Sequence, residues 1–137
     1  MYLLDTNAVI ALLKNDPAAV RKRLRRALSR EVPIGVSSVV LFELWYGVAR
    51  SAHARENTER LRAFMSGSIE VVRFDEDDAA VAGELRARLD EQGTPMGPYD
   101  LLIAAQALRS HSILVTANTN ELARVRGLAW QNWSRRT

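Results

Sequence analysis

The chain alternates short apolar runs with longer segments in which apolar residues recur at helical spacing. Five runs have the length and apolar character of strands, at 1–4, 32–36, 69–74, 112–116 and 128–133, the last of them expected at a sheet edge. The intervals are predicted to be helical at 5–14, from Pro17 onwards, from Ser38 onwards, at 54–65, at 75–93, at 100–110 and briefly within 117–125. Strands separated by helices of this length predict an α/β fold with a parallel sheet and helices on both faces.

Composition bounds the class of protein. With 47% hydrophobic residues in 137, the chain is expected to fold as one globular domain over residues 1–137. It contains no cysteine, which excludes disulfides and thiolate-bound zinc. No basic leader precedes the first apolar run, and no run approaches the roughly 20 apolar residues that span a bilayer. A soluble cytoplasmic protein that does not enter membranes is therefore expected.

Positive charge is concentrated near the N-terminus, although the net charge is only +3. Residues 14–30 carry seven basic side chains against Asp16, which is predicted to cap a helix with Pro17 as its first residue. Arginine suits forked contacts to phosphate, so nucleic acid is one candidate partner. The same pattern also suits a solvated helix face, and the sequence leaves both interpretations open. The first candidates for contact with an RNA backbone are Arg21, Arg23, Arg25 and Arg26, followed by Arg109, Arg124 and Arg126.

Three carboxylates border apolar segments, and each alone has an ordinary structural explanation. Glu43 is the one charge in SVVLFELWYGV, and it could mark the wet stripe of a half-exposed helix or pair with a distant arginine. Asp100 falls in the first turn of a predicted helix, where free N–H groups favour a carboxylate by about 0.3 to 1 kcal/mol. Asp5 could serve only as a helix cap. No single position therefore identifies a site.

The combination of these residues is more informative than its members. Asp5 follows the first strand and Asn118 follows the strand that ends near Thr116, so both are expected at the edge where open α/β sheets bind ligands. Carboxylates about 4 Å apart repel by around 4 kcal/mol at an effective dielectric constant of 20, so a gathered set of acids needs a cation. Oxygen ligands favour Mg²⁺ or Mn²⁺, and neither His53 nor His111 has ligand spacing, which argues against zinc.

Four stretches of the sequence together carry a family resemblance. In order they are MYLLDTNAVIALL, SSVVLFELWYG, GPYDLLIAAQAL and LVTANTNELARVRGLAWQNW, and they span essentially the whole chain. Together they resemble the PIN-domain ribonucleases, in particular the VapC toxins of bacterial VapBC toxin–antitoxin pairs. The resemblance implies a three-layer α/β/α sandwich with a central, mainly parallel sheet. It also implies an acidic site for Mg²⁺, with Mn²⁺ as a substitute, and endonucleolytic cleavage of structured RNA such as tRNA or rRNA.

The motif positions of the family imply roles for particular residues. They place the metal ligands at Asp5, Glu43 and Asp100. The fourth position falls on Asn118, where many PIN domains have aspartate, and this difference leaves the occupancy of a second metal site open. Asn118 would be a neutral ligand or would hold a water of the metal, with Thr6 and Thr116 supporting the ligands. Hydrolysis by water is expected to leave 5′-phosphate and 3′-hydroxyl ends, since the ribose 2′-hydroxyl is not the nucleophile.

The resemblance also implies partners. A VapB-type antitoxin would cover the active site and link the pair to operator DNA, and a homodimer is expected. Leu41, Trp45 and Tyr46, close to Glu43, could belong to an interface, but a place in the core is the preferred prediction. The serious alternative function is a PIN-like module that binds RNA or protein without cutting it. Metal-dependent turnover separates the two.

Overall fold

The computed structural model describes residues 1–135 and contains a five-stranded sheet with the strand order β3-β2-β1-β4-β5. The strands are β1 (Tyr2–Leu4), β2 (Ile34–Ser37), β3 (Ile69–Val72), β4 (Ile113–Val115) and β5 (Ala129–Gln131). Every neighbouring pair is parallel. The parallel α/β sheet expected from the sequence is therefore confirmed, with β5 at one edge.

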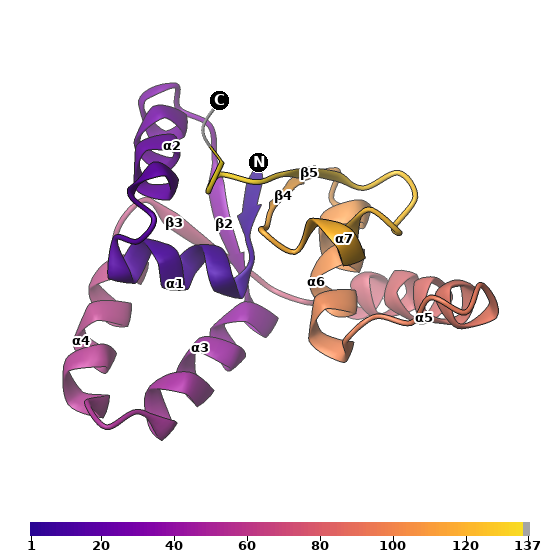
Figure 1. Ribbon diagram of the computed structural model, residues 1–137, viewed down its shortest axis with the longest axis horizontal. Coiled ribbons are helices and arrows are strands. Elements are labelled where there is room, and N and C mark those ends of the chain that lie inside the picture. The colour runs from indigo at the N-terminus through magenta and orange to yellow at the C-terminus, as the bar shows by residue number, and fades with distance from the viewer. Residues whose placement is uncertain (136–137) are drawn as a thin grey trace.

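Helices fill the intervals between the strands. They are α1 (Thr6–Lys14), α2 (Ala18–Ser29), α3 (Ser38–Arg50), α4 (Ala54–Met65), α5 (Glu76–Glu91), α6 (Pro98–Arg109) and α7 (Thr119–Leu122). Right-handed crossovers place the helices that follow β1 and β2 on one face of the sheet and those that follow β3 and β4 on the other. Figure 1 shows α1 to α4 on one side of the strands and α5 to α7 on the other. The predicted three-layer α/β/α architecture is confirmed.

The central strands form the core and position the site. Leu3 and Leu4 are consecutive in β1 and both buried, as a strand covered by helices on both faces requires. β1 pairs with β4 in the register that joins Leu3 to Leu114. Because the order of strands reverses between β1 and β4, polar residues at the carboxyl ends of these two strands open onto one crevice.

Most helices begin within a residue of the predicted start, but α6 begins at Pro98, two residues before the predicted position. The predicted cap of α2 is wrong. Asp75 begins α5 through a capping box with Asp78, at the start of the helix predicted for residues 75–93. By contrast, α2 begins at Ala18 and Pro17 holds its N-cap position, so Asp16 is not the cap. Pro17 is extended, with φ −75° and ψ 148°, which delays the helix by one residue and leaves it without a side-chain cap.

Two aromatic residues of α3 lie outside the core, against prediction. Tyr46 is 55% exposed and Trp45 is 37% exposed, whereas Val40 and Leu44 are buried. Since α3 is apolar nearly all round, its composition could not show which face packs on the sheet. Leu41 is partly buried against the core, as expected. In the part of the chain that the structure describes, no helix is both long and apolar enough to cross a membrane.

Candidate active site

Asp5 lies at the carboxyl end of β1 and begins α1. Its Oδ1 accepts a 2.8 Å hydrogen bond from the backbone N–H of Ala8, which makes Asp5 the N-cap of that helix. The Thr116 side chain, just beyond β4, interacts with the same carboxyl group and lowers its pKa. Asp5 is only 7% exposed, so one buried carboxylate is both a helix cap and a candidate metal ligand.

Glu43 reaches the same edge of the sheet from α3. This helix begins after Ser37, whose Oγ accepts a 3.0 Å hydrogen bond from the Val39 N–H. Farther along the helix, Glu43 is partly buried, and the Thr6 hydroxyl donates a 2.7 Å hydrogen bond to its Oε1. The lone charge of an apolar segment thus faces the start of α1, and within residues 1–135 it forms no ion pair with an arginine.

A third group joins α6 to α7. Asp100 is the third residue of α6, and Asn118 is the N-cap of α7. The Asn118 Nδ2 donates to Asp100 Oδ2 at 3.2 Å and to Glu121 Oε2 at 2.6 Å. Its backbone N–H donates to Thr116 Oγ1 at 3.0 Å, which ties both carboxylates to the end of β4. Asn118 therefore bridges two acids at this edge.

Glu121 is the site residue that sequence reasoning missed. It lies three residues after Asn118, and this spacing puts both side chains on one face of a helical turn. That spacing was the available signal, since the position of Asn118 was already assigned to the site. Glu121 adds a fourth carboxylate to the three that the sequence identified.

Burial and mutual repulsion raise the pKa of two of these acids. The pKa of Asp5 rises from 3.8 to about 6, chiefly because burial disfavours the charged form. The charges of Asp100 and Glu43 add to this rise, and two hydrogen bonds oppose it. Burial also raises the pKa of Asp100, followed by the charges of Glu121 and Glu43. The four carboxylates therefore act on one another electrostatically.

The donor set suits a hard divalent cation. The four carboxylates and the side-chain oxygen of Asn118 are all oxygen ligands, as Mg²⁺ and Mn²⁺ prefer. Within residues 1–135, none of the four carboxylates forms an ion pair. The N-termini of α1 and α6 lie at the acids, but about half an elementary charge from each helix cannot balance four carboxylates. The site lacks positive charge, and a divalent cation fits it.

The carboxylates do not form a closed ligand cage. Among the described residues, no three acidic or histidine side chains lie close enough together to enclose a metal ion. In this arrangement Glu43 accepts a hydrogen bond from Thr6, and Asp100 and Glu121 each accept one from Asn118. A cation at this edge would draw carboxylate oxygens away from these donors or be bound through water.

The predicted arginine candidates lie apart from the acids. Four of the candidates, Arg21, Arg23, Arg25 and Arg26, are on α2. This helix follows the C-terminal end of α1, whereas Asp5 lies at the N-terminal end of α1. Arg109 forms ion pairs with Asp75 and Asp78 at the start of α5, so it serves the fold. Arg124 donates a 3.2 Å hydrogen bond to the Pro95 carbonyl. The structure thus separates the basic helix from the other arginine candidates.

Comparison with known proteins gives consistent matches over nearly the whole chain. The model of the PIN domain family matches residues 2–128. The chain is 40% identical to the tRNA(fMet)-specific endonuclease VapC of Shigella flexneri, over 97% of this chain and 98% of that protein. It is 35% identical to Ribonuclease VapC2 of Rickettsia felis, over 98% of this chain and 99% of that protein. Among solved structures, it is similar to a chain in the crystal structure of VapBC2 from Rickettsia felis bound to a DNA fragment from their promoter. The TM-score is 0.90 at 34% identity, over 96% of this chain and 98% of that one.

Proposed function

Because the chain belongs to the PIN-domain family, we propose that it is a VapC-type toxin and a Mg²⁺- or Mn²⁺-dependent endoribonuclease. Similarity to the ribonucleases of Shigella flexneri and Rickettsia felis supports RNA as the substrate. The observation that carries the proposal is the group of four carboxylates at one sheet edge, which interact electrostatically and form no ion pair within residues 1–135. These carboxylates are Asp5, Glu43, Asp100 and Glu121.

Structured RNA, with transfer RNA first, is the proposed substrate. The Shigella flexneri relative is named for cleavage of tRNA(fMet), and this chain matches it over nearly its whole length. Proteins that recognise structured RNA respond to its shape and its unpaired loops more than to a short code in the protein. We place the activity in the cytoplasm, where transfer RNA is found.

The proposed chemistry is hydrolysis of a phosphodiester bond by water. A bound divalent cation lowers the pKa of water and stabilises the charge that develops on the phosphoryl oxygens. The four carboxylates would hold that cation, with Thr6 orienting Glu43 through the 2.7 Å hydrogen bond. Asn118, which contacts Asp100 and Glu121, would set the spacing of these two ligands. Because water and not the ribose hydroxyl attacks, the expected products carry 5′-phosphate and 3′-hydroxyl ends.

A VapB-type antitoxin and a second copy of this chain are the proposed partners. The similar chain from Rickettsia felis was solved as VapBC2 bound to promoter DNA, which supports an antitoxin that also contacts DNA. Large aromatic side chains lie exposed on α3 and at the start of α6, and such side chains are enriched at protein interfaces. They are Phe42, Trp45, Tyr46 and Tyr99.

Cleavage of purified total RNA by antitoxin-free protein tests the proposal. Wild type is compared in Mg²⁺, in Mn²⁺ and in EDTA, alongside Glu43→Gln and the matched control Glu84→Gln, which changes an exposed carboxylate of α5. Discrete fragments with 5′-phosphate ends are expected from wild type and from the control, only with metal. Folded Glu43→Gln is expected to yield none.

Two results would count against this function. Cleavage that survives EDTA, or that leaves 2′,3′-cyclic ends, would contradict a metal-dependent hydrolysis. Absence of cleavage by wild type on a pool that contains transfer and ribosomal RNA would favour the alternative, a PIN-like module that binds without cutting.

A further inference from the structure

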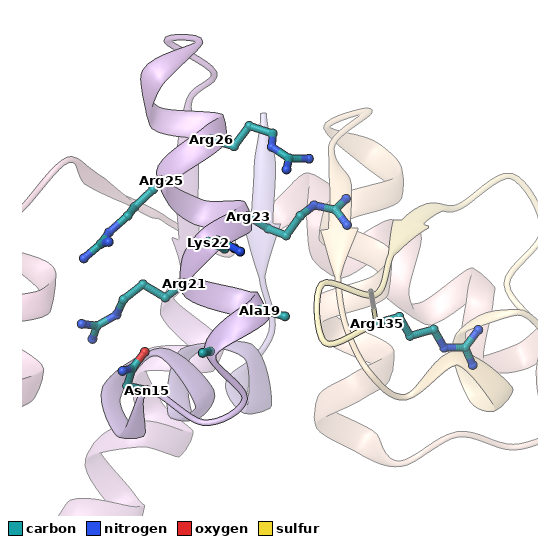
Figure 2. Close-up of a pocket in the computed structure, with 9 residues that line it drawn as sticks. Asn15, Ala19, Arg21, Lys22, Arg23, Arg25, Arg26 and Arg135 are labelled. Atoms are coloured by element: carbon teal, nitrogen blue, oxygen red, sulfur yellow. The ribbon is translucent and has the colours of Figure 1, made fainter. Parts of the chain in front are cut away.

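A basic hollow lies on α2, away from the acids. It has a volume of about 650 Å³, and Lys22, Arg25 and Arg26 of α2 line it together with Asn15 and Arg135. Figure 2 shows basic side chains projecting from both sides of α2, with Arg135 on the neighbouring C-terminal segment. No acidic residue is among those that line the hollow in residues 1–135. Its charge is therefore positive throughout.

Two of the arginines on α2 fix the helix in place. Arg21 donates a 3.0 Å hydrogen bond to the Leu12 carbonyl, which attaches α2 to α1. Arg23 donates a 3.3 Å hydrogen bond to Gln131 and lies 6.0 Å from the centre of the Trp133 ring. These contacts hold the helix against both α1 and the C-terminal segment. The helix that carries most of the basic side chains of the hollow is therefore fixed relative to its neighbours.

The remaining cations of the hollow are free to bind an anion. Lys22, Arg25, Arg26 and Arg135 are exposed, and none of them forms an ion pair with a described residue. The sequence of α2, AAVRKRLRRALS, contains no acid that could neutralise them. Elsewhere the chain does pair arginine with aspartate, at Arg109. The unneutralised cations that line this hollow match the electrostatic footprint of a nucleic-acid-binding surface.

A cleft lies between this hollow and the acidic site, and it is lined by residues adjacent in sequence to each of them. Its volume is about 410 Å³, and it runs beside α1 from Asn7 and Thr116, next to Asp5, to Lys14 and Pro17, next to the hollow. Asp16 is the one carboxylate that lines it in the described part of the chain. α1 rises about 1.5 Å per residue, so the acidic site and the near end of the hollow lie about 15 Å apart.

We propose that one strand of the RNA substrate follows this cleft from the acids to α2, where Lys22, Arg25, Arg26 and Arg135 bind its phosphates. At roughly 3.4 Å per stacked nucleotide, 15 Å corresponds to about four or five nucleotides between the bond that is cut and the near end of the hollow. This inference rests on the proposed function for the identity of the substrate. It assigns a substrate-binding surface to a region that carries no catalytic group.

Binding without cleavage tests the surface. Fluorescent single-stranded oligoribonucleotides of mixed sequence, about 3 and about 12 nucleotides long, are titrated with protein in EDTA at several salt concentrations, with anisotropy as the readout. Arg25→Gln/Arg26→Gln is compared with Arg86→Gln/Arg88→Gln. The control pair lies on exposed positions of α5, on the opposite face of the sheet, and changes the net charge equally. Thermal unfolding checks that all the proteins are folded.

The two variants are expected to differ clearly. Wild type and the control should bind the long oligomer more tightly than the short one. Loss of two phosphate contacts reduces the slope of log K against log [salt] by about 1.4, which corresponds to about 25-fold weaker binding at 0.1 M salt. The α2 variant should show this loss for the long oligomer and little change for the short one.

Two outcomes would overturn the inference: equal binding by wild type and the α2 variant, or equal losses in the α2 variant and the control. Because these measurements are made without metal and without turnover, they are independent of the cleavage assay. If wild type cuts RNA and the α2 variant binds RNA normally, the proposed binding surface on α2 is wrong and the proposed ribonuclease function is supported. If the binding difference is seen and wild type cuts no RNA, the ribonuclease is wrong.

Discussion

Replacing Asp5 by asparagine is expected to stabilise the metal-free protein while weakening metal binding. Burial is the main reason that the pKa of Asp5 rises from 3.8 to about 6 in the folded chain. One pKa unit corresponds to about 1.4 kcal/mol, so the ionised Asp5 destabilises the folded state by about 3 kcal/mol at neutral pH. Asparagine removes that charge and caps a helix as well as aspartate does. The pKa shift already includes the favourable hydrogen bond from the Ala8 N–H, so the net gain in stability is about 3 kcal/mol.

The dependence on pH has a definite sign. A carboxyl group with a raised pKa binds its proton more tightly in the folded state than in the unfolded state. Its contribution to stability is therefore fully present below pH 3.8 and is lost as the pH rises through about 6. The stability difference between Asp5→Asn and wild type is expected to be complete above about pH 7 and to vanish near pH 4.

Urea unfolding in EDTA at several pH values measures this difference. Asp90→Asn, an exposed position of α5, is the control for loss of one carboxylate. Added Mg²⁺ should then stabilise wild type and the control, since a cation that binds only the folded state raises the free energy of unfolding. It should stabilise Asp5→Asn much less. The reasoning is refuted if Asp5→Asn is no more stable than wild type at about pH 8 in EDTA, or if the difference persists near pH 4.

Four further substitutions distinguish the site from the rest of the fold. Glu121→Gln is expected to weaken Mg²⁺ binding about tenfold or more, measured by Mg²⁺-dependent thermal stability, and an unchanged titration would remove Glu121 from the site. Thr6→Val removes the 2.7 Å hydrogen bond to Glu43 at nearly constant shape, so RNA cleavage should fall about 10- to 100-fold. A fall in stability large enough to account for the lost cleavage would instead indicate a structural role. Gly35→Ala should destabilise by about 1 to 3 kcal/mol, because its Cβ would lie 2.8 Å from a side chain of β3. Gly83→Ala, on α5, should stabilise the fold by about 1 kcal/mol, because an added Cβ would have no atom within 4 Å and alanine favours the helix. Urea midpoints of Gly35→Ala and Gly83→Ala that shift in the same direction would contradict this contrast.

The fold was largely predictable because its elements have clear periods and boundaries. The helix expected at 54–65 is found at Ala54–Met65, and the fifth strand lies at an edge as expected. The start of α2 was not predictable from cap chemistry alone, since proline suits both the extended N-cap position and the first helical residue. The exposed aromatic side chains of α3 were missed because an apolar sequence does not reveal which face meets the sheet.

The site was predictable as far as strand ends determine it. Asp5 and Thr116 follow β1 and β4, and the parallel sheet brings these strand ends together. The role of Glu43 could be assigned only through the family resemblance, because its hydrogen bond with Thr6 joins residues 37 positions apart. Glu121 was missed because its meeting with Asp100 through Asn118 depends on how α7 packs beside α6. The spacing of Asn118 and Glu121 indicates that they share one face of a helical turn, but no spacing in the sequence indicates a contact between two helices.

Two buried aspartates in this chain differ in whether a positive charge neutralises them, and the difference supports a function for one of them. Asp78 is completely buried and is paired with Arg109, as a structural carboxylate requires. Asp5 is 7% exposed and has no such partner among the described residues, although the chain carries 19 basic side chains. An arginine beside Asp5 would stabilise the folded state, but it would also occupy the position in which a metal cation would bind. The missing counter-charge at Asp5 is therefore better explained by a site that binds a cation than by a requirement of the fold.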